Sequence, residues 1–355
     1  MRQYIVLLFL CVSFLSFGQR PPVPNLPFTS LEEAGLNRDS MNALIDEIDN
    51  FPQRNFIGLV VIKDNQLATE WYFNSFWRSH IHDIRSSGKS ITSLLLGVAI
   101  KEGLVQSIDQ DVYSFFPKKK YPMLHEDYRK VKIKDLLDMS SGLDADSDDG
   151  NTPGNAGQWM GKDEWLTYIL GIPQTGTPGE KWVYADINAA LIGAIIEEKS
   201  GMSLRDFAQE KIFDPLGITQ FYWYTNASNQ TMAAGNLYIS TLAFAKLGTL
   251  VANQGKWGNE QIVDAAYIER LLTHKVFDFP EGWRADQYGM LWYKSKRKFG
   301  KKEVEYLWAS GFGGNHLLVV PAEKMVIAIT SAGYGLRSAH ARSYRIFSKL
   351  MNALD

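Results

Sequence analysis

Apolar residues change their spacing along this chain, and the changes predict which segments form helices and which form strands. Residues 37–48 place apolar side chains on one side of a helical repeat. Two apolar runs follow at 56–62 and 67–73, separated by the polar segment Lys63-Asp64-Asn65-Gln66. Short apolar runs on either side of a turn-forming segment predict a β-hairpin. The chain is therefore expected to begin with a helix and two paired strands.

The middle of the chain is predicted to be helical, and strands return near its end. Helical spacing covers 91–100, 133–139, 162–170, 188–199 and 204–213. Strand-like runs follow at 289–294, 304–309, 316–320 and 326–331, and a helical pattern comes last at 338–350. Strands at both ends around a helical middle predict an α+β fold. It has one antiparallel β-sheet flanked by helices, with an inserted helical subdomain.

The N-terminal segment differs in kind from the rest. Arg2 precedes an apolar run over 4–17, and Gly18 offers a small residue for cleavage. A basic start, an apolar stretch and a small residue are typical of a secretory signal peptide, and the run is too short to span a bilayer comfortably. We predict a signal peptide at 1–18, one mature domain at 19–355 and an exported protein, periplasmic or extracellular. A retained membrane anchor is the alternative.

Composition excludes several classes of function. The single cysteine, Cys11, lies inside the predicted signal peptide, so the mature chain has no disulfide, no cysteine nucleophile and no thiolate metal site. The 355 residues are 45% hydrophobic and 21% charged, with a formal net charge of -2. This is the composition of a globular protein, and it lacks the basic field that attracts nucleic acid or an anionic membrane.

The residues that can do chemistry begin with Arg85-Ser86-Ser87-Gly88-Lys89, directly before a predicted helix. Residues three apart share one face of a helix, so Ser86 and Lys89 become neighbours. A serine hydroxyl attacks a carbonyl once a base takes its proton, and lysine can be that base when burial lowers its pKa. The first helical turn adds free backbone N–H groups for an oxyanion. The alternative without chemistry is a helix-capping serine beside a surface lysine.

Two further clusters hold polar or flexible residues at the edges of predicted elements. Tyr184, Asp186 and Asn188 lie just before a predicted helix. Tyr184 can carry a proton there, and either of the other two can orient Lys89; the alternative is that all three only cap the helix. A glycine-rich segment at 308–315 lies between two predicted strands. Glycines at a strand edge let a ligand approach the backbone, where a free N–H can complete an oxyanion hole, although a tight turn explains them equally well.

Taken in order, the three clusters resemble the S-x-x-K, Y-x-N and K-T-G signature of the serine β-lactamase and penicillin-binding-protein superfamily. The similarity covers residues 28–352 and is greatest to class C β-lactamase relatives and 6-aminohexanoate-dimer hydrolases. It implies that Ser86 is acylated, that Lys89 is its base and that Tyr184 relays the proton. It also implies a β-lactamase/transpeptidase-like fold, with the active site between the sheet and the helical subdomain.

Two departures from the signature bear on the substrate. A carboxylate, Asp186, stands where the second motif has an amide, and Ala309-Ser310-Gly311 replaces K-T-G. The resemblance places four residues against the substrate: Asp186, Ser310, Gly311 and Phe312. Because the missing lysine helps to bind a β-lactam carboxylate in the superfamily, we expect poor β-lactam turnover.

Two weaker candidates for a metal site are set aside. His80 and His82 alternate ahead of Ser86 without a clear third ligand. Acidic residues within 144–149 resemble a calcium loop, but the glycine comes one position late and the bidentate glutamate is missing. We therefore expect no metal and no other cofactor, and a solvated acidic loop near the cleft.

Two hypotheses of different class follow from these residues. The first is a secreted, cofactor-independent serine hydrolase that cleaves a small amide, ester or peptide through an acyl-enzyme on Ser86. The second is a catalytically silent module that keeps this fold to bind a cell-wall peptide or a partner protein. The presence of Ser86, Lys89 and Tyr184 together favours the enzyme, because a binding module has no need of all three. A carboxylesterase, an amidase, a D-amino-acid peptidase and a weak β-lactamase stay open, as does the oligomeric state.

Overall fold

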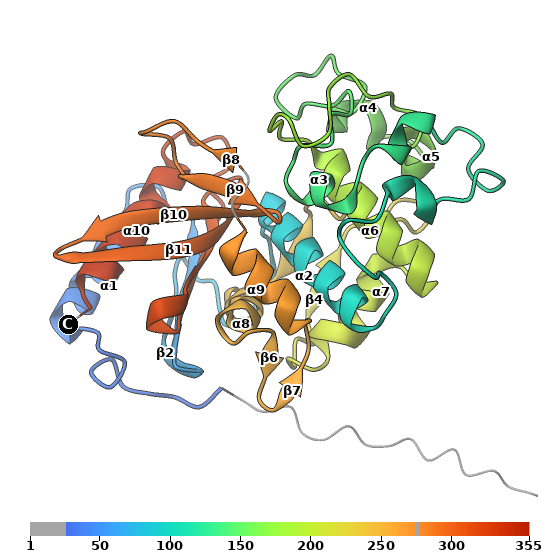
Figure 1. The fold of residues 1–355 in the computed structure, drawn as a ribbon. Coiled ribbons are helices and arrows are strands. Elements are labelled where there is room, and N and C mark those ends of the chain that lie inside the picture. The colour runs from blue at the N-terminus through green and yellow to red at the C-terminus, as the bar shows by residue number, and fades with distance from the viewer. Residues whose placement is uncertain (1–25, 275–276, 355) are drawn as a thin grey trace, which may run out of the picture.

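The computed structural model describes residues 26–274 and 277–354 (Figure 1). The signal peptide predicted at 1–18 lies outside the described residues, so its cleavage stays a prediction. The described chain forms one large sheet, two small sheets and the helices that pack around them.

The large sheet has eight strands, and it takes them from both ends of the chain. Its strands are β1 (Phe56–Lys63), β2 (Gln66–Tyr72), β8 (Phe277–Asp278), β9 (Gln287–Gly289), β10 (Trp292–Phe299), β11 (Lys302–Gly311), β12 (Asn315–Val320) and β13 (Met325–Ser331). Their order across the sheet is β2-β1-β13-β12-β11-β10-β9-β8, so the first strand of the chain pairs with the last. Every neighbouring pair is antiparallel, which confirms the predicted α+β class with one antiparallel sheet.

The predicted N-terminal hairpin forms as β1 and β2 because a two-residue turn joins them. Asp64 and Asn65 hold φ angles of 48° and 62°. Aspartate and asparagine tolerate this left-handed region, and a turn with two positive φ angles matches the twist of paired strands. Lys63 and Gln66 pair directly across the turn.

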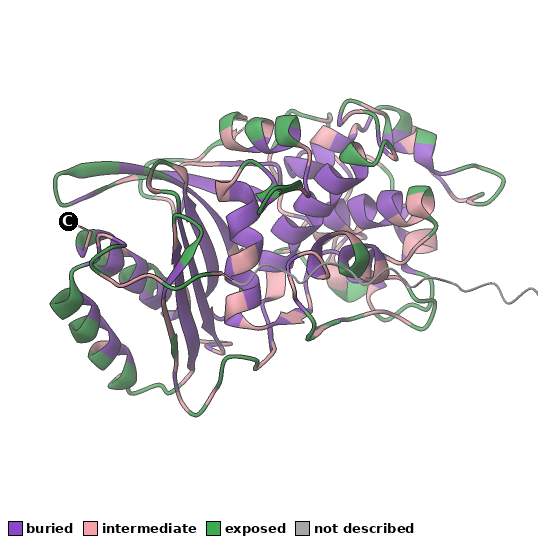
Figure 2. Ribbon diagram, turned by 90° about the horizontal axis from the view of Figure 1, so that it is seen from below, coloured by how far each residue is buried: buried purple, intermediate pink, exposed green. Residues whose placement is uncertain are grey.

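Helices cover both faces of the sheet (Figure 2). On one face α8 (Thr241–Ala252) packs against β1, β12 and β13. Its Gly248 allows close packing, since a Cβ there would lie 2.6 Å from a methyl group of Val326. On the opposite face α10 (Ala339–Asn352) lies against β10, β12 and β13, with α1 (Arg38–Asp49) beside it. Every residue of β12 is buried as a result, so its sequence lacks the alternation of a half-exposed strand.

The middle of the chain supplies a helical layer on the α8 side of the sheet (Figures 1 and 2). Its helices are α2 (Gly88–Lys101), α3 (Ile133–Leu137), α4 (Ala156–Trp159), α5 (Trp165–Ile169), α6 (Asp186–Ser200), α7 (Leu204–Ala208) and α9 (Ala265–Thr273). Short turns of 3₁₀ helix cover Arg85–Ser87 (η1), Val112–Phe115, Glu126–Arg129 and Pro321–Glu323, and a π-helical turn covers Gln209–Phe213. The small sheets are β3 (His82–Asp83), β5 (Leu237–Ile239) and β4 (Phe221–Trp223), and β6 (Lys256–Trp257) with β7 (Glu260–Gln261). Over residues 26–274 and 277–354, no helix has the length and apolar character needed to cross a membrane.

Some predicted elements are wrong, for identifiable reasons. The strand predicted at 289–294 is interrupted, because Met290 and Leu291 adopt left-handed φ angles of 58° and 61° and turn the chain between β9 and β10. The helix predicted at 162–170 is confined to α5. Helix α8 was not predicted at all. It is buried almost all round, as α2 is, and it was missed although Phe244, Leu247 and Val251 recur at helical spacing.

Candidate active site

The candidate nucleophile lies in a turn that is fixed from two sides. Ser86 belongs to the 3₁₀ turn η1, directly before α2, and is half-buried. Upstream, the Ile84 N–H donates to the Leu237 carbonyl at 3.0 Å, which ties the turn to β5. Downstream, Ser87 Oγ donates to the Asn315 carbonyl at 3.1 Å, which ties it to β12. Ser86 is therefore held where the large sheet, a small sheet and α2 meet.

Lys89 approaches Ser86 from the first turn of α2. Its side chain is 2% exposed, and its Nζ lies 3.1 Å from Ser86 Oγ. Nζ also donates to the Ala234 carbonyl at 2.7 Å, and Asp186 Oδ1 lies 2.6 Å away. Ser86 and Lys89 are therefore neighbours as the spacing predicts, and Lys89 is not a surface lysine.

The charge on Lys89 differs from what burial alone would give. Burial favours the neutral amine and lowers the pKa of Lys89, but the Asp186 carboxylate together with Tyr184 outweighs it, so the pKa is raised above the ordinary value. The expectation that desolvation lowers this pKa is wrong, because Asp186, expected only to orient Lys89, also brings a negative charge to it. Lys89 is an ammonium near neutral pH, and it must lose a proton before it can act as a base.

A loop holds Tyr184 and Asp186 in place through Ser147. The Ser147 N–H donates to the Tyr184 carbonyl at 2.8 Å, and the Asp186 N–H donates to Ser147 Oγ at 3.1 Å. Lys89 Nζ lies 4.9 Å from the centre of the Tyr184 ring. The structure thus brings the predicted tyrosine and carboxylate to the predicted serine and lysine.

One candidate partner of Lys89 is misplaced, and another partner was not predicted. Asn188 donates to a methionine sulfur at 3.3 Å and does not orient Lys89. The backbone carbonyl of Ala234 accepts from Lys89 instead. Gly235 permits this approach, since a Cβ there would lie 3.1 Å from the Arg85 carbonyl oxygen. A backbone acceptor carries no side-chain signature, and the glycine was the only signal available in the sequence.

Gly311 brings the end of β11 against the nucleophile turn. A Cβ at this position would overlap the Ile84 carbonyl oxygen and would lie 2.9 Å from Ser87 Oγ. The turn before Ser86 and the strand end are therefore in direct backbone contact. Such a contact requires glycine at this strand position.

Gly311→Ala is expected to lower kcat by at least about tenfold and to destabilise the fold by roughly 1–3 kcal/mol. The added methyl group must push β11 away from the turn that carries Ser86. Steady-state hydrolysis of an activated ester and thermal unfolding measure the two effects. Gly161→Ala is the matched control, because nothing lies within 4 Å of a Cβ at that position. Wild-type kcat in Gly311→Ala would show that attack does not depend on where β11 ends.

The other residues predicted to contact substrate on this strand divide into two groups. Phe312 is exposed and lines the same cavity as Ser86. Ser310 pairs with His316 across β11 and β12 and does not line that cavity, so its contact with substrate stays a prediction. Ala309, at the place of the K-T-G lysine, is buried.

A cavity of about 210 Å³ opens beside Ser86. Four large apolar residues line it, Trp159, Met160, Met232 and Phe312, together with Asp186. Cavities with apolar walls and a few convergent polar groups bind small molecules and orient them. This one can hold a small, mostly apolar group next to the hydroxyl of Ser86.

The cation at the mouth of this cavity is Arg85. Its Nε lies 3.2 Å from Asp83 Oδ2, and its guanidinium lies 4.6 Å from the centre of the Tyr334 ring. Its φ angle of 54° is in the left-handed region, which residues other than glycine seldom adopt and which is often found at active sites. The guanidinium of the residue before Ser86 is therefore held by Asp83 and Tyr334.

The weaker candidates for metal ligands have structural explanations. His82 Nε2 lies 3.2 Å from the Ser331 carbonyl and 3.1 Å from the Tyr334 hydroxyl, and burial lowers the pKa of His82 to about 4. In the acidic loop, Asp146 Oδ1 accepts the Asp148 N–H at 2.8 Å, so this carboxylate faces its own backbone. Within the part of the chain that the structure describes, no group of three or more histidine, cysteine, aspartate or glutamate side chains can hold a metal ion.

A family model and several known proteins match this chain. The family model described as Beta-lactamase matches residues 41–350. A protein of Escherichia coli K12 named D-alanyl-D-alanine carboxypeptidase is 28% identical over 222 residues, which are 55% of this chain and 50% of that protein. The chain thus spans about half the length of the curated relatives it matches.

Solved structures share the fold across almost the whole chain. A 6-aminohexanoate-dimer hydrolase from Bacillus anthracis superposes with a TM-score of 0.74 at 18% identity, covering 94% of this chain and 88% of its own. The D-amino acid amidase from Ochrobactrum anthropi SV3 superposes with a TM-score of 0.66 at 16% identity, covering 89% of this chain and 98% of its own. At these identities the likeness establishes the β-lactamase/transpeptidase fold.

Proposed function

Because this chain belongs to the β-lactamase family, we propose that it is an exported serine hydrolase that cleaves a small amide or ester through an acyl-enzyme on Ser86. The observation that carries the proposal is the 3.1 Å contact between Ser86 Oγ and the buried Nζ of Lys89, at the edge of a cavity. Burying an ammonium costs free energy that Asp186 has to offset. A module that only binds a partner has no use for that arrangement beside a hydroxyl.

In acylation, Ser86 Oγ forms a bond to the substrate carbonyl carbon while the carbonyl π electrons move onto oxygen. The backbone N–H groups of Ser86 and Phe312 are the proposed donors to that oxyanion, since the Gly311 contact holds the two segments together. The serine proton passes to the neutral form of Lys89. This proton then moves to the leaving amine or alcohol as the C–N or C–O bond breaks. In deacylation a water molecule attacks the acyl carbon, and the bond from that carbon to Ser86 Oγ breaks. The carboxylic acid is released and the Ser86 hydroxyl is restored.

The resting site must first lose one proton, because Lys89 is held as an ammonium. Asp186 is 21% exposed and touches Nζ, so it offers a path for that proton to solvent. Tyr184 borders the same nitrogen and is the proposed relay to the leaving group. Lys89 is therefore assigned as the base in its neutral amine form, which becomes more populated as pH rises.

The substrate is proposed to be small and linear. The 6-aminohexanoate-dimer hydrolase and the D-amino acid amidase act, by their names, on small amides. The cavity of about 210 Å³ beside Ser86 is suited to a group of that size. Ala309 supplies no cation where the superfamily uses a lysine, so β-lactams are proposed to be poor substrates.

Export rests on the N-terminal pattern alone. A basic start, an apolar run over 4–17 and a small residue at Gly18 support a signal peptide and a site of action outside the cytoplasm.

Intact-mass spectrometry after exposure to a fluorophosphonate and, separately, to a penicillin tests the proposal. A single fluorophosphonate adduct is expected, and peptide mapping should place it on Ser86, because only an activated serine reacts. Slow or absent labelling by the penicillin is expected, in line with the alanine at 309. No adduct with either reagent, on protein shown to be folded, would overturn the enzyme assignment and favour the silent binding module.

A further inference from the structure

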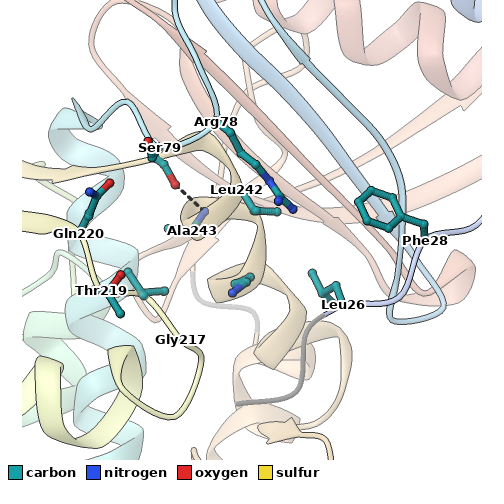
Figure 3. Close-up of a pocket in the computed structure, with 12 residues that line it drawn as sticks. Leu26, Phe28, Arg78, Ser79, Gly217, Thr219, Gln220, Leu242 and Ala243 are labelled. Atoms are coloured by element: carbon teal, nitrogen blue, oxygen red, sulfur yellow. Dashed lines mark hydrogen bonds between the residues drawn. The ribbon is translucent and has the colours of Figure 1, made fainter. Parts of the chain in front are cut away.

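A second cavity, of about 350 Å³, lies apart from the active site and shares no lining residue with the cavity at Ser86 (Figure 3). It lies between the segment after β2, the segment before β4 and the first turns of α8. Arg78 and Lys246 both line it, and we call it the Arg78–Lys246 pocket. Figure 3 shows Arg78 reaching into this space, with Thr219 and Gln220 on another wall.

Lys246 brings a positive charge that the described part of the chain does not neutralise. Its side chain is half-buried, and its Nζ donates to the Leu216 carbonyl at 2.8 Å. It forms no ion pair with any residue in 26–274 or 277–354. Burial lowers the pKa of Lys246, and the nearby charge of Arg78 lowers it further. A partly buried ammonium with one neutral acceptor and the Trp257 ring 5.8 Å away lacks the counter-ion that such a charge normally has.

Arg78 brings a second positive charge, and its ion-pair partner lies outside the pocket. Its Nε donates to Glu70 Oε2 at 3.0 Å, and that oxygen also accepts from the Tyr72 hydroxyl at 2.8 Å. Glu70 does not line the pocket. Two like charges therefore face one cavity. The carboxylate of Glu70 lies outside it and accepts from both Arg78 and Tyr72. An anion inside the cavity would relieve the repulsion between Arg78 and Lys246.

We propose that the Arg78–Lys246 pocket binds a small ligand that carries a phosphate group. Phosphate oxygens point in several directions, so one group can accept from a guanidinium fork, from an ammonium and from the Ser79 or Thr219 hydroxyl together. A planar carboxylate has two oxygens and matches fewer of these donors. The cavity is larger than a phosphate ion, and Leu242 provides an apolar wall for the rest of the ligand.

Calorimetric titration of the full chain with inorganic phosphate and with glycerol 3-phosphate tests this, with acetate as the comparison anion at constant ionic strength. Saturable binding of both phosphates at one site is expected, with acetate weaker. Lys246→Gln and Arg78→Gln should each weaken phosphate binding by at least about tenfold, because each removes a charged donor. Lys211→Gln is the control, since Lys211 is paired with Glu102 and Glu210 and does not line the pocket.

Three outcomes would overturn the proposal: no saturable phosphate binding, acetate binding as tight as phosphate, or equal weakening by Lys211→Gln. Should Lys246→Gln fail to fold, Arg78→Gln decides the matter, because its side chain is 54% exposed and its loss leaves the core intact. Ester hydrolysis is expected to be unchanged in all three variants. The binding result therefore stands or falls independently of the proposed hydrolase activity.

Discussion

Ser86→Ala is expected to lower kcat/KM for any amide or ester substrate by about 10⁴-fold or more, with the fold unchanged. In the proposed mechanism the Oγ atom forms the covalent bond of the acyl-enzyme, and without it only substrate binding and the oxyanion donors contribute to the rate. The loss should appear in kcat, because the missing step is the chemical one. Steady-state kinetics, together with thermal unfolding to confirm that the variant is folded, measure it.

Ser87→Ala is the matched control, since it removes a hydroxyl one residue away. Ser87 Oγ donates to the Asn315 carbonyl, so this variant should lose about 1 kcal/mol of stability yet keep its fluorophosphonate adduct. The reverse result, with Ser86→Ala active and Ser87→Ala inactive, would move the nucleophile by one position. Equal activity of both variants and wild type would mean that neither serine carries the reaction, and the silent binding module would then be the better hypothesis.

Local patterns predicted the nucleophile segment well. Ser86 and Lys89 are three residues apart, within one turn of the chain. The helix that follows has apolar residues at a helical period that is visible in the sequence. The hairpin β1–β2 was also predictable, because Asp64 and Asn65 are residues that tolerate the two positive φ angles of its turn. Elements defined by their own residues are thus accessible without the structure.

Features that depend on the far side of the core were not accessible in this way. Helix α8 packs against β1, β12 and β13, so its place in the fold is set by strands from both ends of the chain. The break at Met290 and Leu291 places two ordinary apolar residues in left-handed conformations, which no propensity predicts. The Arg78–Lys246 pocket joins side chains from distant segments, so neither residue stood out in the chain.

Among the features that the sequence did not predict, the protonation state of Lys89 matters most for the proposed mechanism. Burial and a charged partner shift a lysine pKa in opposite directions, and the 2.6 Å contact with Asp186, together with Tyr184, makes the second effect larger. Asp186 replaces the amide of the Y-x-N motif, which the sequence relates to substrate binding. The same carboxylate also changes the surroundings of Lys89, the proposed base. An amide at this position would orient Lys89 without holding its proton.

Asp186→Asn is therefore expected to move the pH dependence of kcat to lower pH by roughly one unit or more. In the wild type the raised pKa of Lys89 keeps the neutral amine scarce at neutral pH, so activity should rise as pH increases into the alkaline range. The isosteric amide removes the carboxylate charge and leaves burial as the dominant influence. The pKa of Lys89 then falls, the neutral amine appears at lower pH, and the rising limb of the profile follows it.

Profiles of kcat between pH 5 and 10.5, recorded below the unfolding midpoint of each variant, measure the shift. Asp186→Asn should itself unfold at lower temperature, because the ammonium of Lys89 loses its counter-ion. Asp149→Asn is the control for a lost surface carboxylate. Asp149 is exposed, and its Oδ1 accepts the Asn151 N–H, which an asparagine oxygen can also do. The pH profile of this variant should therefore match that of the wild type. A rising limb that stays in place in Asp186→Asn would exclude Lys89 as the group that takes the serine proton. The charged lysine would then serve as an electrostatic partner, and Tyr184, which borders its Nζ, would become the candidate base.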